Sequence, residues 1–258
     1  MKKVWMTSLV SAEEAVQETM GQLKQYGLEV NGHFWEDDLE KVAWIKPRAE
    51  LIDSKVDLWL ILASEENLSS PSIRYGLSLL TLTVQAQMGL GFPIVILLTE
   101  GETPPVESLP TPLKNADFLS AKDAGFGANL VAKVHSQIKE IALEYRLDVY
   151  GNPQTGQWLE VGPTDASWNG ALLGVAGAEI AFHAVGPNGS LPSKSVLNYP
   201  MEGLKLNLGD KEYVAWAVQN ELDDETSYFA KIDGYPDSVL FGPYSSEDEA
   251  EVHVVQLK

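Results

Sequence analysis

In the first 146 residues, short apolar runs alternate with segments in which apolar residues recur at helical spacing. The runs that predict strands are 4–9, 28–35, 58–63 and 93–98. The segments that predict helices are 12–26, 38–52, 71–88 and 128–145. A short edge strand is expected at 116–120, after a proline-rich irregular loop at 99–115. Because strands and helices alternate and run 58–63 is apolar on both faces, the pattern predicts a doubly wound parallel α/β sheet of flavodoxin-like type.

Capping residues mark where several of these helices begin and end. Ser11 with Glu14 fits a capping box at the start of the first helix, and Gly27 stops that helix with a residue able to adopt positive φ. Pro47 predicts a local irregularity in the second helix.

The pattern changes near Asp148, where the stretch 148–158 is expected to be a linker or turn. Strand-like runs then recur about every ten residues, which favours an antiparallel sheet or sandwich. These runs are 157–161, 179–185, 196–199, 204–208, 212–219, 227–232 and 238–241. The tail fits either a helix capped by Ser246 and Glu249 or a strand in 252–257. We therefore expect an α/β domain over 1–147 and a smaller β-rich domain over 148–258.

Charge and composition restrict the classes of partner. The chain has 258 residues, 45% hydrophobic and 21% charged, which is typical of a globular protein. Its net charge of −19 makes nucleic acid and anionic lipid unsuitable partners, and it favours either solubility or docking to a basic partner. Residues 1–150 hold 13 basic and 21 acidic residues, and residues 151–258 hold 5 and 16, so the smaller part is the more acidic. The acidic run 221–225 is interpreted as a solvated hairpin tip, because it lacks calcium-loop spacing.

The residue inventory excludes several kinds of site and anchor. There is no cysteine, and the four histidines lack zinc spacing, so we expect no metal site. The apolar run after Lys2 and Lys3 is too short for a signal peptide, and no run approaches the roughly 20 residues of a membrane span. We expect a cytoplasmic protein with no membrane partner.

The third strand and the helix after it resemble the Toll/interleukin-1 receptor (TIR) domain family. That family has an apolar strand ending in Ser, then a polar turn, then a helix beginning Ser-x-Trp-Cys-x-x-Glu-Leu. In this chain Ser64, Ser70 and Leu77 match the pattern, whereas Ser72 and Ile73 replace Trp-Cys, and Gly76 replaces Glu. The segment 32–57 also resembles the second-strand loop and following helix of that family. The resemblance covers residues 1–146 and implies a TIR-like fold.

Proteins similar to nucleoside deoxyribosyltransferases have the same strand order. The resemblance implies that, in both families, a carboxylate on the helix after the third strand acts on the ribose during cleavage of a glycosidic bond. An oxocarbenium-like transition state requires such an anion or nucleophile nearby. Gly76 cannot supply it. If the chain is an enzyme, Glu65 and Glu66 are the expected catalytic acid and base, since they directly follow the third strand.

Six further residues are candidates for ligand binding at the carboxyl ends of the strands. Thr7 and Ser8 end the first strand, Trp35 ends the second and is able to stack on a base, and Ser64 ends the third. Arg74 and Tyr75 lie on the first turn of the following helix. Arg74 suits either an anion clamp or a surface ion pair with Glu65 or Glu66. The chain lacks the glycines of a phosphate-binding or dinucleotide loop.

Two functions follow from these observations. The first is non-catalytic recognition or assembly, in which a TIR-like domain self-associates or keeps a degenerate nucleotide-type crevice, and an acidic β-rich domain binds a protein partner. The second is an enzyme that cleaves an N-glycosidic bond in NAD or a nucleoside. No cofactor is expected under the first hypothesis, and NAD or a nucleotide is the ligand under the second.

Overall fold

The computed structural model describes residues 1–53, 55–138, 140–245 and 251–258. The chain forms two compact units: Met1–Leu39 with Ala43–Ile141, and Glu40–Val42 with Ala142–Lys258. Among the described residues, no helix combines the length and the apolarity needed to cross a membrane.

The first unit is built on a five-stranded parallel sheet in the order β2-β1-β3-β4-β5. Its strands are β1 (Lys3–Ser8), β2 (Glu29–Phe34), β3 (Leu58–Ser64), β4 (Ile94–Glu100) and β5 (Asp117–Ser120). β3 lies at the centre and every residue from Leu58 to Ala63 is buried, as expected for a strand covered on both faces. This strand order confirms the flavodoxin-like α/β prediction.

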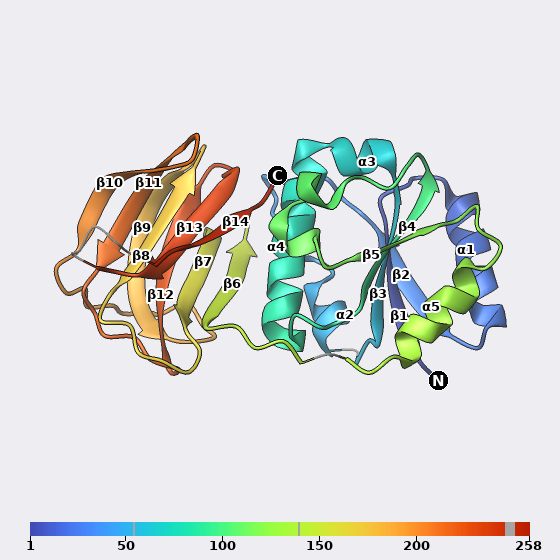
Figure 1. Ribbon diagram of the computed structural model, residues 1–258, viewed down its shortest axis with the longest axis horizontal. Helices are drawn as coiled ribbons and strands as arrows, with labels where there is room; N and C mark the ends of the chain where they lie inside the picture. Colours follow the sequence, from blue (N-terminus) through green and yellow to red (C-terminus); the bar gives the residue numbers. More distant parts are fainter. Residues whose placement is uncertain (54, 139, 246–250) are drawn as a thin grey trace. The chain divides into compact units, whose positions relative to one another are not determined.

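Helices cover both faces of this sheet, with α1 and α5 on one side and α2 and α4 on the other (Figure 1). The α-helices are α1 (Glu13–Gln25), α2 (Arg48–Asp53), α3 (Glu65–Ser69), α4 (Pro71–Met88) and α5 (Phe126–His135). Short 3-10 turns are η1 (Ala43–Ile45), η2 (Val106–Ser108) and η3 (Thr111–Leu113). α4 has the predicted bounds, with Pro71 in its first turn, and each residue from Tyr75 to Gln85 is buried.

Several predicted helix boundaries in this unit were wrong. α1 has Ala12 as its N-cap, with no side-chain capping bond, in place of the expected Ser11–Glu14 box. The predicted helix 38–52 is reduced to η1 and α2, because Val42 has φ +53° and Pro47 separates the two turns. A capping box does occur where a turn was expected: Ser64 accepts from Asn67 N, and Asn67 Oδ1 accepts from Ser64 N, which starts α3.

The last predicted helix, 128–145, ends much earlier than expected. α5 stops at His135, and Tyr145 begins β6 (Tyr145–Asn152), where it lies opposite Pro163 of β7 (Gly156–Pro163). The apolar residues that extended the helical pattern, Ile138 and Ile141, are exposed. The described residues between His135 and Tyr145 lie in neither a helix nor a strand, and Tyr145 itself pairs with β7.

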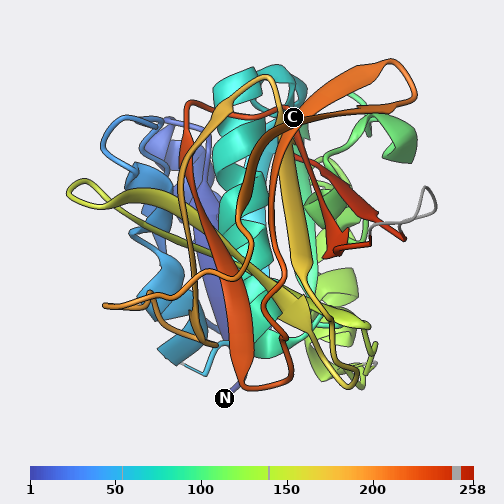
Figure 2. The same ribbon diagram turned by 90° about the vertical axis from the view of Figure 1, so that its left-hand side faces the viewer.

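The second unit consists of two antiparallel sheets, which confirms the β-rich prediction. One has the order β6-β7-β12-β9 and the other β10-β11-β8-β13-β14. The remaining strands are β8 (Ala171–Ala176), β9 (Glu179–Pro187), β10 (Met201–Leu208), β11 (Lys211–Val218), β12 (Thr226–Asp233), β13 (Ser238–Pro243) and β14 (His253–Gln256). Figure 2 shows β10 and β11 as a twisted hairpin that reaches past its neighbours at the upper right.

Aromatic contacts join the two sheets within the interior of this sandwich. Tyr145 of β6 meets Phe241 of β13 with ring centroids 4.9 Å apart, and His183 of β9 meets Trp216 of β11 at the same distance. Both pairs join one sheet to the other, so the inner faces pack as in other sandwiches.

Two predictions in this unit need correction, and a third concerns residues that the structure does not describe. The stretch 148–158 is the end of β6, a tight turn at 153–155 and the start of β7, so it is a hairpin. Val196–Tyr199 was predicted as a strand but is irregular. The side chain of Asn220 bonds to the backbone of Val196 and Asn198 there, in place of a neighbouring strand. β8 was not predicted. The proposed Ser246–Glu249 capping box lies outside the described residues, and β14 confirms the alternative strand.

Candidate functional site

The carboxyl ends of β1, β2 and β3 meet at the point where the strand order reverses, which is where open α/β sheets bind ligands. The backbone holds these ends together: Trp35 N donates to Ser8 O, and Leu9 N donates to Leu62 O, both at 2.8 Å. Ser8 and Trp35, two of the predicted ligand-binding residues, are therefore neighbours.

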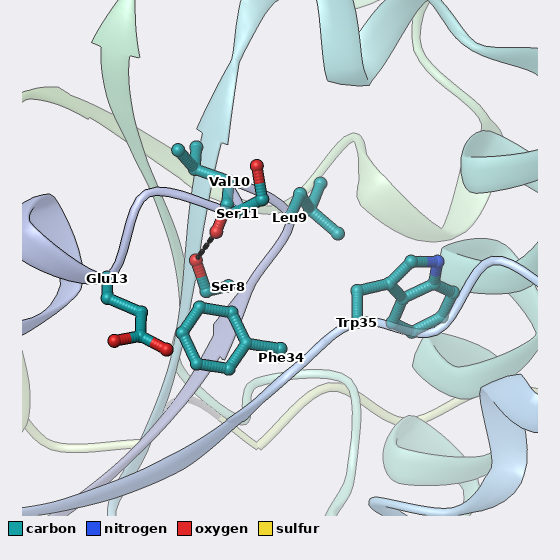
Figure 3. Close-up of a pocket in the computed structure, with 7 residues that line it drawn as sticks. All are labelled: Ser8, Leu9, Val10, Ser11, Glu13, Phe34 and Trp35. Atoms are coloured by element: carbon teal, nitrogen blue, oxygen red, sulfur yellow. Dashed lines mark hydrogen bonds between the residues drawn. The ribbon is translucent and has the colours of Figure 1, made fainter.

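A hollow of about 240 Å³ lies at this edge, and we call it the Ser8 hollow. Its lining residues, drawn in Figure 3, are Ser8, Leu9, Val10, Ser11, Glu13, Phe34 and Trp35. The phenyl ring of Phe34 lies beside Ser8 and Glu13, whereas Trp35 turns toward the other side (Figure 3). The Ser8 hydroxyl donates to Val10 O at 2.7 Å, which fixes the loop after β1.

The Ser8 hollow is unsuited to phosphate. α1 begins beside it with Glu13 and Glu14 in the first turn, where carboxylates stabilise the helix dipole and repel an anion. Ala12 at the N-cap contributes no side-chain hydrogen bond. The arrangement therefore favours a neutral or cationic group next to Glu13.

Glu13 is the carboxylate that lines this hollow, and it was not among the predicted catalytic residues. Its position in the chain contained a usable signal, because it opens the helix that follows β1. Glu65 lies on α3 and accepts a hydrogen bond from Glu102 N at 3.0 Å, so its carboxylate caps the turn after β4. Glu66 is exposed in the first turn of α3.

Position 76, where the resembled families place their carboxylate, is covered by the indole of Trp35. A Cβ atom built on Gly76 would lie 2.8 Å from Trp35 Cζ2 and 3.4 Å from Trp44 Cβ. Ordinary carbon contacts lie at about 3.5–4.0 Å, so a side chain at position 76 requires Trp35 to move. Trp35 thus fills the space next to Gly76.

Thr7 and Ser64 have structural bonds at the same edge of the sheet. Thr7 is fully buried, and its hydroxyl accepts from the indole Nε1 of Trp59 at 2.8 Å. Ser64 caps α3 through Asn67, as described above. These bonds use the polar groups that the sequence suggested for a ligand.

Arg74 and Tyr75 follow on the first turns of α4. Arg74 donates to the carbonyl of Ser108, and burial lowers the pKa of its guanidinium below the usual value. Tyr75 is fully buried, so its ring packs in the protein interior. Of the eight predicted residues, the structure brings Ser8 and Trp35 into one hollow and engages Thr7, Ser64, Glu65 and Arg74 in structural hydrogen bonds.

No protein-family model matches the chain, and no curated protein matches it in sequence. Within the described part of the chain, no group of three or more His, Asp or Glu residues is arranged to hold a metal ion.

Proposed function

We propose that this chain is a non-catalytic recognition and assembly protein. Its TIR-like first unit retains a degenerate ligand crevice, and its acidic β-rich unit binds a protein partner. The observation that carries the proposal is the packing of Trp35 over Gly76. The position that would hold the acid for glycosidic cleavage has neither a carboxylate nor the room for one.

The bonding of Glu65 supports the same conclusion. The Glu65 carboxylate accepts a hydrogen bond from the backbone N–H of Glu102, so one of its oxygens holds the loop after β4. A catalytic carboxylate must instead face the anomeric carbon of the substrate.

An exposed loop on the second unit supports partner binding. Val196 is 78% exposed and Tyr199 is 76% exposed, and Tyr199 has φ +47°. The backbone of Asn198 is fixed on both sides: its N donates to Asn220 Oδ1, and its O accepts from Gln219 N, each at 2.8 Å. A bulky residue held in the left-handed region and presented to solvent by a rigid loop suits an anchor for another protein.

Charge defines the kind of partner that this loop suits. The acidic run 221–225 directly follows Asn220, and the unit around it is the more acidic part of the chain. A partner with basic residues around an apolar pocket would therefore gain both steering and an anchor. Nucleic acid and anionic membranes are unsuitable for the same electrostatic reason.

A base-release assay tests the non-catalytic part. The full chain at high concentration is incubated with NAD and with nucleosides, and free base is measured by chromatography. We expect no release above a no-protein control. Release that disappears in Glu13→Gln but persists in Glu65→Gln would overturn the proposal.

That outcome would establish the second candidate function, N-glycosidic cleavage. The specific observation in its favour is that Glu13 lines the Ser8 hollow. In that case Glu13, in place of Glu65 or Glu66, would supply the carboxylate.

Sedimentation equilibrium tests the assembly part with a second copy of the chain as the partner. Because two copies of a chain with net charge −19 repel each other, we expect any association to be weak at low salt and to strengthen with added salt, and the pair Val196→Ser with Tyr199→Ser to weaken it. Leu208→Ser is the matched control, since Leu208 is also exposed but lies in β10. A chain that stays monomeric at every concentration rejects self-association and leaves a different protein as the partner.

A further inference from the structure

The Ser8 hollow places an aromatic ring and a carboxylate side by side at an exposed edge of the first unit. Phe34 ends β2 and lies opposite Ser8 in the register with β1. Because β2 is an edge strand of the sheet, the Phe34 ring is 48% exposed. The side chain of Glu13 extends from α1 toward that ring (Figure 3). A ligand in the hollow therefore contacts both groups.

The charge around the hollow is negative and uncompensated. Within the part of the chain that the structure describes, no Lys, Arg or His forms an ion pair with Glu13. Glu14 adds a second carboxylate in the same turn of α1. The positive end of a helix dipole carries only about half an elementary charge, so the two carboxylates outweigh it. The net charge of −19 adds to this field, and the hollow attracts cations.

The lining favours a cation that has no N–H groups to satisfy. A primary ammonium brings three donors. The carbonyl oxygens of Ser8 and Val10 already accept hydrogen bonds, from Trp35 N and from the Ser8 hydroxyl. A quaternary ammonium needs no acceptor, since its methyl groups pack on apolar side chains and its charge lies over an aromatic face. The volume of about 240 Å³ is below the roughly 300–1,000 Å³ of larger ligand sites, so the ligand is small.

We propose that the Ser8 hollow binds the quaternary ammonium group of a small free cation. The ammonium lies over the face of the Phe34 ring and next to the Glu13 carboxylate, and its methyl groups contact Leu9. This inference rests on the ligand crevice of the proposed function, to which it assigns a class of ligand. The site needs no catalysis, and its occupation is measured separately from base release and from self-association.

Choline and 3,3-dimethylbutanol are matched probes, because they have the same shape and differ only in the charged nitrogen that replaces a carbon. Each is titrated into the full ¹⁵N-labelled chain at constant ionic strength, and the amide resonances of Ser11 and Glu13 are followed by NMR. We expect choline to shift both resonances in a saturable manner and to bind about tenfold more tightly than the alcohol, the combined effect of a cation–π contact and an exposed charge pair. Phosphocholine should bind more weakly than choline, because its phosphate adds negative charge beside Glu13. Equal or tighter binding of phosphocholine would assign the hollow to a lipid head group and reject a free cation.

Variants separate the carboxylate from the ring. Glu13→Gln and Phe34→Leu should each weaken choline binding about threefold. Glu14→Gln is the control for the first, because it changes the net charge equally in the same helical turn but does not line the hollow. Phe182→Leu is the control for the second, because that ring is 56% exposed but lies in the second unit. Equal weakening by Glu13→Gln and Glu14→Gln would refute a direct contact with Glu13.

Two results with the wild-type chain overturn the proposal and require no variant to fold. One is the absence of a saturable shift at millimolar choline, and the other is equal affinity for choline and the neutral alcohol. Either result leaves the base-release and sedimentation experiments unaffected, so the class of ligand is rejected independently of the proposed function.

Discussion

Gly76→Ala tests the packing of Trp35 against α4 most directly. Position 76 lies inside α4, where alanine stabilises a helix over glycine by about 1 kcal/mol. The added Cβ lies 2.8 Å from Trp35 Cζ2, against about 3.5 Å for an ordinary carbon contact. Overpacking of this kind costs about 1–3 kcal/mol. The cost of the steric contact with Trp35 therefore equals or exceeds the gain in helix propensity. We expect Gly76→Ala to lower the free energy of unfolding by up to about 2 kcal/mol.

The effect of Gly76→Ala should change sign when the indole is removed. In a Trp35→Ala background nothing crowds the new Cβ on that side, so Gly76→Ala should stabilise by about 1 kcal/mol, the helix term alone. The coupling energy between the two substitutions is then about 1–3 kcal/mol, which is typical of residues in contact. Urea unfolding followed by circular dichroism at 222 nm measures it, because the described α-helices all lie in the first unit.

Gly21→Ala supplies the control for helix propensity. Gly21 lies inside α1, and a Cβ there meets nothing within 4 Å. It should stabilise by about 1 kcal/mol in both the wild-type and Trp35→Ala backgrounds. If Gly76→Ala stabilises the wild-type chain as much as Gly21→Ala does, Trp35 does not cover position 76, and the main argument against a catalytic acid there fails.

Three further predictions concern buried or bonded polar groups. Glu65→Ala should speed amide hydrogen exchange at Glu102, because the Glu102 N–H loses its acceptor. The free energy of unfolding should change by less than about 1 kcal/mol, because Glu65 is exposed. An unchanged exchange rate at Glu102 would contradict this prediction. The double-mutant cycle of Trp59→Phe with Thr7→Val should give a coupling of about 1 kcal/mol in urea unfolding, and additive effects would show that this buried bond contributes nothing. Burial lowers the pKa of His33 from 6.5 to about 4, so between these pH values the unfolded chain binds more protons than the folded chain. The free energy of unfolding is therefore highest above pH 6.5 and falls as the pH drops toward 4. His33→Phe should remove about 2 kcal/mol of that loss between pH 7 and pH 4.5 in urea titrations, and an unchanged pH profile would count against it.

The sequence by itself determined the elements whose local signals agree with their packing. The apolar run Leu58–Ala63 required burial on both faces, and this fixed β3 at the centre of a parallel sheet. Pro71 and the periodicity that follows it gave α4 its bounds. Gly27, with φ +79°, ended α1 as expected.

Tertiary contacts decided the elements in which local signals competed. The helical pattern continues to Tyr145, but α5 ends at His135, and Tyr145 pairs with Pro163 of β7. Val42 adopts a positive φ that its side chain disfavours, so no local rule could have predicted the break before η1.

The candidate site shows the same division. Sequence order located Ser8, Trp35 and position 76 at one edge of a sheet, because the ends of parallel strands meet there. Only the folded chain decided that Trp35 fills the space beside Gly76, that Glu65 holds a loop, and that Glu13 faces the Ser8 hollow. Hydrogen bonds and side-chain packing join residues distant in sequence, and their directions depend on the three-dimensional arrangement of all the strands at once.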